Sequence, residues 1–281
     1  MKSMISIIGL PIFRGQTLTG VKHAPNYFLN YNFERKLNKE IKVHNTKLSF
    51  NNNIFDSLKF SKEVVRSYKE RNYDFNLFVG GDHSISMATI SGMISEKEKD
   101  DYVVLWIDAH TDCNTFKTTP SMNLHGMSVA GILGLLPEPF DTFKCINKNQ
   151  LMYLGIRSID LGEQQFLDNN SEYSISNKLI TSTDFMEQET KKLEEIENFI
   201  KNKKIHVSFD VDSLDPKIIS STGTPVENGL KLNHINNIFD LLSNHNVVSM
   251  DLVEFNPLLG NANKSYDNIS SILGRFINKL V

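Results

Sequence analysis

The segment VVLWIDAHTD, residues Val103–Asp112, joins an apolar run typical of a buried strand to an alternating pattern of Asp and His. Two further apolar runs, Phe75–Val79 and Ile205–Phe209, lead into GGDHS and SFDVD. Parallel strands end at one edge of their sheet, so these segments can meet there. Residues two apart in extended chain point to the same side. The segments therefore predict one site of carboxylates and imidazoles, formed by His83, Asp108, His110, Asp112, Asp210 and Asp212.

So many carboxylates in one buried site would repel one another and raise one another's pKa. Two divalent cations remove that problem and give a two-metal hydrolytic site, in which a shared water becomes hydroxide near neutral pH. A single Asp after a strand is usually a helix cap or turn residue, and Asp82 is expected to be one. The other histidines are expected to be ordinary surface or core residues: His23, His44, His206, His234 and His245.

Short β-branched or aromatic runs alternate with helix-spaced runs along the whole chain. Strands are expected at Ile5–Leu10, Phe75–Val79, Val103–Ile107, Leu151–Ile156, Ile205–Phe209 and Val247–Val253, and helices at Thr190–Lys201, Leu232–Asn244 and Tyr266–Leu280. Several strand runs lack apolar–polar alternation, which indicates parallel strands buried on both faces. The pattern predicts an α/β sandwich with a mostly parallel sheet. No Gly/Ser/Pro-rich linker divides the 281 residues, so one domain, 1–281, is expected.

Composition excludes several classes of function. The net charge of −3, without a long basic run, does not indicate a nucleic-acid partner. No apolar run is long enough to span a bilayer, so no membrane partner is expected. Two cysteines, Cys113 and Cys145, give no disulfide framework and favour a reduced, cytoplasmic location. The sequence has no GxGxxG, P-loop or GxSxG motif, so nucleotide binding and serine hydrolysis are not indicated.

The segments GGDHS, DAHTDCNT, NLHGM, SFDVDSLDP and SMDLVEFNP, in this order, resemble the ureohydrolase family, and within it the arginases. The similarity extends from Gly9-Leu10-Pro11 to Glu254-Phe255-Asn256-Pro257. It implies a single ureohydrolase domain, a three-layer α/β/α fold with an eight-stranded parallel sheet, and two Mn²⁺ per subunit. By position, one ion would be held by His83, Asp108, Asp112 and Asp210, and the other by Asp108, His110, Asp210 and Asp212. Such ligands suit Mn²⁺, although Fe²⁺, Co²⁺ and Ni²⁺ stay open.

The resemblance also implies a reaction, the hydrolysis of L-arginine to L-ornithine and urea by a metal-bridging hydroxide. Asp112 would accept a hydrogen bond from the nucleophile, and His125 would carry a proton to the leaving amine. Glu254 would pair with the guanidinium group, whose geometry a carboxylate matches. The remaining substrate-binding positions would be His110, then Asn114, Ser121 and Asn123 for the α-carboxylate, Asp160 and Glu163 for the α-ammonium, and Thr224 at the guanidinium end.

Alternatives to an arginase stay open. One is another amidinohydrolase, of the agmatinase or guanidinobutyrase type, whose substrate lacks the α-carboxylate. Another is a non-catalytic relative, which would be expected to lack a ligand or His125. A deacetylase-type relative is disfavoured because the ligand set is complete. Cys113, Phe116 and Lys117 depart from the residues expected in arginases and bear on substrate affinity. A homo-oligomer, trimer or hexamer, is the expected assembly.

Overall fold

A parallel eight-stranded sheet forms the centre of the computed structural model, which describes residues 3–30, 33–38, 42–49, 53–168 and 178–281. Its strand order is β2-β1-β3-β8-β7-β4-β5-β6, and every neighbouring pair is parallel. The strands are β1 Met4–Leu10, β2 Lys42–Lys47, β3 Phe75–Gly80, β4 Tyr102–Ile107, β5 Leu151–Ile156, β6 Leu179–Thr181, β7 Lys204–Asp210 and β8 Val247–Val253. The expected parallel sheet is confirmed.

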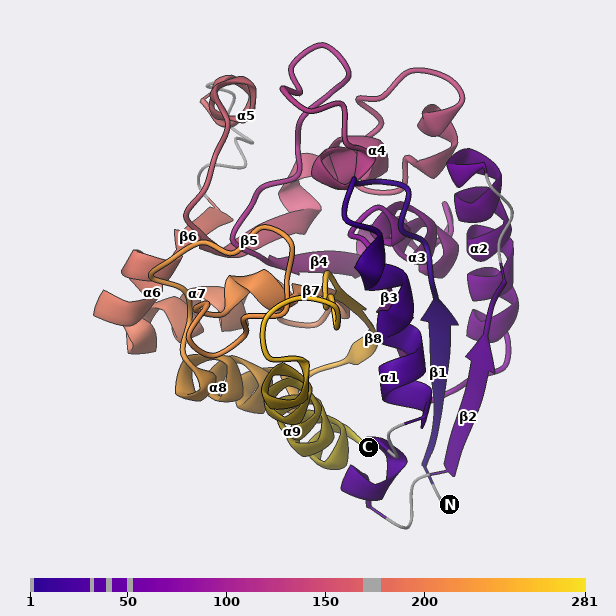
Figure 1. Ribbon diagram of the computed structural model, residues 1–281, viewed down its shortest axis with the longest axis vertical. Helices are drawn as coiled ribbons and strands as arrows, with labels where there is room; N and C mark the ends of the chain where they lie inside the picture. The colour runs from indigo at the N-terminus through magenta and orange to yellow at the C-terminus, as the bar shows by residue number, and fades with distance from the viewer. Residues whose placement is uncertain (1–2, 31–32, 39–41, 50–52, 169–177) are drawn as a thin grey trace.

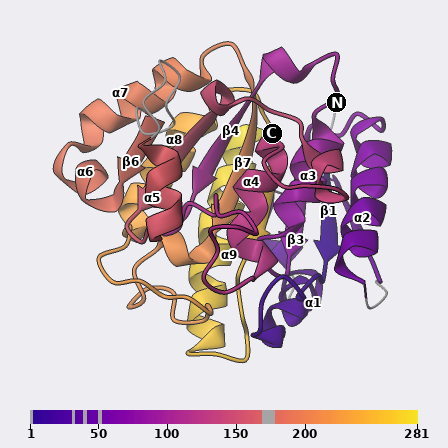
Figure 2. The same ribbon diagram turned by 90° about the horizontal axis from the view of Figure 1, so that it is seen from above.

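Helices cover both faces of the sheet and complete three layers (Figures 1 and 2). One face carries α1 Ala24–Asn30, α6 Ser182–Glu187, α7 Glu189–Ile200, α8 Leu232–Leu242 and α9 Ala262–Leu280. The other carries α2 Ile54–Lys69, α3 Ile85–Met93, α4 Ser128–Leu133 and α5 Leu161–Leu167. The 3₁₀ turns are η1 Thr19–His23, η2 Phe33–Lys36, η3 Lys99–Asp101, η4 Leu124–Met127, η5 Phe140–Phe143, η6 Lys148–Gln150 and η8 Val211–Ser213. Across the described ranges, no helix combines the length and apolarity needed to cross a bilayer.

Strand β4 shows why its sequence is apolar without alternation. Val103, Leu105 and Ile107 enter the core on the α7–α9 side, whereas Val104 and Trp106 enter the core on the α2–α4 side. All five side chains are buried, and burying each one contributes about 1.5–3 kcal/mol. A strand with both faces covered therefore needs an apolar residue at every position.

The two outer strands of the sheet are absent from the sequence-based expectations. Strand β2, KVHNTK, is polar, pairs only with β1 and exposes most of its side chains. Strand β6 has three residues and pairs only with β5. An edge strand has one hydrogen-bonded neighbour and a partly solvated surface, so its sequence does not carry the apolar signal of a central strand.

Gly81 is a position at which a side chain would collide with the backbone of another segment. A Cβ atom there would lie 1.7 Å from the carbonyl oxygen of Ile12, which belongs to the loop after β1. The same loop is fixed to Gly81 and Asp82 by backbone hydrogen bonds from Gly81 N to Leu10 O and from Asp82 N to Ile12 O. Close packing of two backbones thus holds the segment that leads into His83.

We expect Gly81→Ala to lower the free energy of unfolding by at least about 2 kcal/mol, because the backbone of Ile12 must move to admit the methyl group. Gly126→Ala is the matched control, since a Cβ at Gly126 meets no atom within 4 Å. Urea unfolding of both variants measures the difference. Equal stabilities of the two variants would contradict this account of the close approach.

Candidate metal centre

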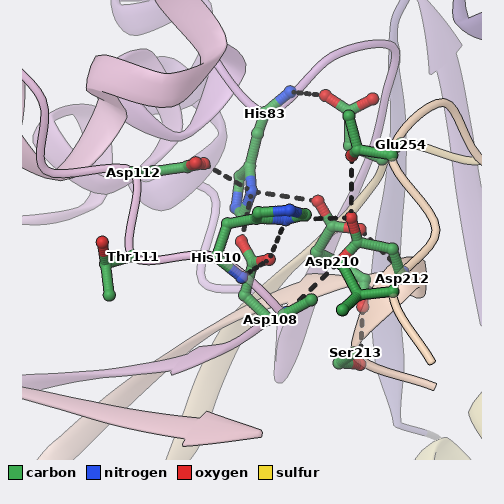
Figure 3. A network of polar contacts seen from close by, with 12 residues as sticks. His83, Asp108, His110, Thr111, Asp112, Asp210, Asp212, Ser213 and Glu254 are labelled. Atoms are coloured by element: carbon green, nitrogen blue, oxygen red, sulfur yellow. Dashed lines mark hydrogen bonds and ion pairs between the residues drawn. The ribbon is translucent and has the colours of Figure 1, made fainter. Parts of the chain in front are cut away.

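Four consecutive strands of the sheet supply the site at their carboxyl ends (Figure 3). In the order β3-β8-β7-β4, His83 follows β3, Glu254 follows β8, Asp210 ends β7 and Asp108 follows β4. Chain segments more than 100 residues apart therefore meet because their strands are neighbours. The predicted convergence at one sheet edge is confirmed.

Turns, rather than extended chain, direct the paired carboxylates into the site. Strand β4 ends at Ile107, and Asp112 has a left-handed backbone with a φ of 47°. After β7 the chain enters the turn η8, in which the Asp212 N–H donates to Asp210 Oδ1 at 2.8 Å. The prediction that extended geometry aligns these residues is therefore wrong. Glu254 also has a positive φ, of 63°, and such backbones in non-glycine residues concentrate at functional sites.

All six predicted ligands lie together, in two groups that share Asp108. In the first, His83 Nδ1 lies 3.0 Å from Asp108 Oδ2, 3.1 Å from Asp112 Oδ2 and 3.2 Å from Asp210 Oδ2. In the second, His110 Nδ1 lies 3.2 Å from Asp212 Oδ2 and 3.5 Å from Asp108 Oδ1. Within each of the sets His83, Asp108, Asp112 and Asp108, His110, Asp212, the ligand atoms lie within 4.8 Å of one another.

The electrostatics of the cluster fit divalent cations. Burial and the charges of Asp212 and Asp108 raise the pKa of Asp210 well above its usual range. Burial and the charge of Asp108 likewise raise the pKa of Asp112. Buried His83 Nδ1 faces three carboxylate oxygens without a well-aligned hydrogen bond to any described residue. A buried imidazole nitrogen without a well-aligned hydrogen bond, surrounded by carboxylates, is a donor set that suits a cation of the Mn²⁺ type.

Protons compete with cations for this cluster. Burial by itself lowers the pKa of His83, but the carboxylates of Asp108, Asp112 and Asp210 outweigh it and raise that pKa well above its usual range. Burial also opposes the charged form of His110, and the charges of Asp212 and Asp108 nevertheless raise its pKa to about 12. Metal binding must therefore displace protons from the imidazoles, which couples metal affinity to pH.

A second pair, His125 and Glu254, lies beside the cluster. Glu254 Oε1 lies 3.1 Å from His125 Nδ1 and accepts the backbone N–H of His83 at 2.8 Å. Its other oxygen, Oε2, accepts the Gln16 side-chain amide. Burial raises the pKa of Glu254, but the bond to His125 outweighs it and the net pKa is lowered. Burial lowers the pKa of His125, and the bond to Glu254 outweighs it and raises that pKa to about 9. The pair can hold a proton at neutral pH.

Two loops with predicted substrate-binding residues are joined beside this centre. The Asn114 side-chain amide donates to Asp160 Oδ2 at 2.9 Å. Buried Glu163 accepts the backbone N–H of Cys113 and of Asp160, at 3.1 and 2.9 Å, and burial raises its pKa to about 7. The structure thus brings Asn114, Asp160 and Glu163 into one hydrogen-bonded group.

The other predicted substrate-binding residues lie at more exposed positions. The Thr224 hydroxyl donates to Asp212 Oδ2 at 3.0 Å, so this residue touches the ligand cluster directly. Ser121 is exposed and its hydroxyl accepts the Asn123 N–H at 3.2 Å. Of the departing loop residues, Lys117 is exposed, whereas Phe116 is partly buried and packs near Phe140.

Trp106 and Gln16 contact the site, although no sequence motif predicted a role for either residue. The Trp106 indole N–H donates to Asp108 Oδ2 at 3.0 Å, and its ring stacks on the His83 ring with centroids 4.1 Å apart. Gln16 holds Glu254, as described above. Trp106 is the only tryptophan of the chain and stands two residues before Asp108, a position that could have identified it.

Comparisons with known proteins agree with this geometry. A sequence profile of the arginase family matches residues 3–277. The chain is 32% identical to the arginase of Entamoeba histolytica over 279 residues, covering 90% of each protein. It is 30% identical to the arginase of Bacillus subtilis over 301 residues, covering 98% of this chain and 99% of that protein. The solved structure of Entamoeba histolytica arginase in complex with L-ornithine superposes with a TM-score of 0.86 at 28% identity, covering 99% of this chain and 97% of that one.

Mn²⁺ is expected to stabilise the protein, because the cation relieves the repulsion among the clustered carboxylates. At a free concentration one hundred times the dissociation constant, the gain in unfolding free energy is about 2.7 kcal/mol. Asp210→Asn should lose most of this gain, whereas Asp240→Asn, on the surface of α8 beside Arg275 and Lys279, should keep it. Thermal unfolding with Mn²⁺ and with chelator measures both. An undiminished gain in Asp210→Asn would contradict the assignment.

The His125–Glu254 pair predicts a pH dependence of the metal-free protein. The pKa of His125 rises from 6.5 to about 9 on folding, so its stabilisation is complete below pH 6.5 and disappears as the pH rises through 9. The difference in unfolding free energy between the wild type and His125→Asn should therefore shrink over this interval, by at most about 3 kcal/mol. Urea unfolding at a series of pH values tests this, and a constant difference would contradict it.

Proposed function

The chain belongs to the arginase family, and we propose that it hydrolyses L-arginine to L-ornithine and urea with two Mn²⁺ per subunit. The observation that carries the proposal is the meeting of six metal-type ligands with the His125–Glu254 pair at one sheet edge. The solved arginase with bound L-ornithine, which is similar over nearly the whole chain, supports the proposed product.

The residues proposed as ligands divide into two overlapping sets. His83, Asp108, Asp112 and Asp210 would hold one cation, and Asp108, His110, Asp210 and Asp212 the other, with Asp108 and Asp210 shared. When bound, a pair of divalent cations supplies an activated water near neutral pH. Asp112 would accept a hydrogen bond from the nucleophile at its carboxylate. The short contacts of His83 Nδ1 and His110 Nδ1 to these carboxylates support the division.

Proton transfer and guanidinium binding fall to His125 and Glu254 in this proposal. Glu254 keeps His125 charged near neutral pH, so the imidazolium would give a proton to the leaving amine. The two carboxylate oxygens of Glu254 lie in hydrogen-bond contact with His125 and Gln16. The same two oxygens could accept two N–H donors of a planar guanidinium group. The raised pKa of His125 therefore serves general-acid catalysis.

Recognition of the amino-acid end would come from the loops beside the centre. Asn114, Ser121 and Asn123 would bind the α-carboxylate, and Asp160 and Glu163 the α-ammonium. The contact between Asn114 and Asp160 supports this assignment, because it brings a neutral donor and an anion to one place, as an α-amino acid requires. Thr224 would line the guanidinium end, and His110 would be a further substrate-binding residue.

Three further features of the proposed enzyme are its domain organisation, its cellular compartment and its assembly. The match of the family profile to residues 3–277 supports a single domain over 1–281. The buried free thiols of Cys113 and Cys145 support a reducing, cytoplasmic compartment. We further propose a homo-oligomer, trimer or hexamer, which size measurement in solution tests.

The first test measures urea released from L-arginine and, in parallel, from agmatine, with Mn²⁺ and with chelator. Mn²⁺-dependent urea from L-arginine alone is the expected result. Urea from agmatine alone would retain the metal centre and overturn the assignment of the loops. Absence of urea from both substrates, with metal bound, would overturn the proposed reaction.

The loop assignment predicts a selective loss in Asn114→Ala. Its kcat/KM for L-arginine should fall about tenfold or more, because a charged group loses a hydrogen bond, while any residual turnover of agmatine changes little. Asn244→Ala, in the exposed turn that follows α8, is the matched control and should leave both values unchanged. A larger loss for agmatine than for L-arginine would contradict the assignment.

A further inference from the structure

A buried polar group lies beneath His83, between strands β7 and β8 and helix α3. It consists of Ser208 on β7, Asp251 on β8, and Ser86 and Thr89 on α3, all 0% exposed. A carboxylate in such a place is costly unless hydrogen bonds satisfy it. The group contains none of the proposed metal ligands, so the proposed reaction does not account for Asp251.

Hydrogen bonds connect Asp251 to the metal centre. His83 Nε2 lies 2.9 Å from Ser208 Oγ, and Ser208 Oγ lies 2.9 Å from Ser86 Oγ. Ser86 Oγ donates to Asp251 Oδ2 at 2.7 Å, and Ser208 Oγ reaches the same oxygen at 3.4 Å. Thr89 donates to it as well, at 2.9 Å. The carboxylate thus terminates a chain of hydroxyl groups that begins at His83.

The Asp251 carboxylate at the end of this chain determines which way each hydroxyl proton points. A carboxylate only accepts hydrogen bonds, and each hydroxyl has a single proton to give. The proton of Ser86 goes to Asp251, so the proton of Ser208 must point toward Ser86 or Asp251. Ser208 therefore has no proton for His83 and accepts one from Nε2–H. The Nδ1 of His83 is then the atom that faces Asp108, Asp112 and Asp210, and its lone pair becomes available when a cation displaces the Nδ1 proton.

We propose that Asp251 is a positioning residue for the metal centre, which, through Ser86 and Ser208, keeps the His83 proton on Nε2 and presents Nδ1 to the cation. The inference rests on the proposed metal site. The outer hydrogen bond of a metal-binding histidine generally fixes its tautomer and ring orientation. Here the Trp106 ring, stacked on His83 at an interplanar angle of 8°, restricts the same imidazole from its face.

A purely structural role for Asp251 is the competing explanation. His206 Nε2 lies 3.0 Å from Asp251 Oδ2, and His206 Nδ1 lies 2.8 Å from Ser249 Oγ, so Asp251 also contacts a buried histidine that is not among the proposed metal ligands. The two explanations differ at Ser208. A structural partner of His206 does not need Ser208, whereas the chain to His83 does.

Two variants test the proposal, with Mn²⁺ affinity as the readout. Asp251→Asn introduces an amide that can donate, which allows the hydroxyl chain to reverse and Ser208 to donate to Nε2. Ser208→Ala removes the acceptor for Nε2–H. Each should weaken Mn²⁺ binding about 10–100-fold. Calorimetric titration gives the dissociation constant, and quenching of Trp106 fluorescence, from the only tryptophan of the chain, reports binding beside His83.

Ser6→Ala is the matched control, since Ser6 is a fully buried strand serine whose hydroxyl donates to Asn76 at 2.7 Å. Urea unfolding of the metal-free variants measures the structural effect separately. Asp251→Asn combined with Ser208→Ala should bind Mn²⁺ no more weakly than the weaker single variant, because both act through one hydrogen bond.

Mn²⁺ affinity of Ser208→Ala within about threefold of the wild type would overturn the inference, since a lost outer partner costs more. This variant also decides the matter if Asp251→Asn does not fold. Equal losses of affinity in Ser208→Ala and Ser6→Ala, tracking their losses of stability, would likewise overturn it. A wild-type protein that binds no Mn²⁺ would overturn the metal centre itself, a result distinct from binding that the variants leave unchanged.

Discussion

Repulsion among Asp108, Asp112, Asp210 and Asp212 is the constraint on which the rest of the structure depends. Their burial removes the water that would otherwise screen them, and the pKa values of Asp112 and Asp210 rise as a result. A protein without a use for such a cluster would be more stable with apolar residues there. The positive φ of Asp112 adds backbone strain to the same place. Cations offset the charge repulsion. The surrounding fold must compensate for the backbone strain and hold the carboxylates in place.

Hydrogen-bond donors fixed to the sheet hold the clustered carboxylates in place. The backbone N–H of His110 donates to Asp108 at 2.7 Å, and that of Ala109 to Asp212 at 3.2 Å. The Trp106 indole adds a third donor, to Asp108. Each donor comes from a residue of the buried strand β4 or of the turn that directly follows it, so the sheet itself holds these carboxylate oxygens. A group of side chains held by a strand keeps its geometry even when the surrounding loops differ.

The clustered His and Asp residues and the predicted substrate-binding loops occupy different parts of the structure. The ligand cluster and the His125–Glu254 pair lie at the carboxyl ends of the central strands, whereas the loops with Asn114 and Asp160 lie outside them. Buried Glu163 ties these two loops together through backbone N–H groups. Phe116 and Lys117, which depart from the residues expected in arginases, belong to the same stretch of loop as Asn114.

The sequence by itself determined the central strands, their parallel arrangement and the six clustered His and Asp residues proposed as ligands. Each of these depends on local signals: an apolar run, a strand end and the type of the next few residues. It did not determine the edge strands β2 and β6, whose polar or short sequences carry no such signal. Only the tertiary structure decided that β3, β8, β7 and β4 are consecutive, and that turns rather than extended chain direct Asp112 and Asp212 inward. The contact of Asp251 with Ser86 belongs to the same category, since residues 165 positions apart meet only when helix and sheet pack. Strand order and such contacts depend on which buried surfaces fit one another, and no window of neighbouring residues contains that information.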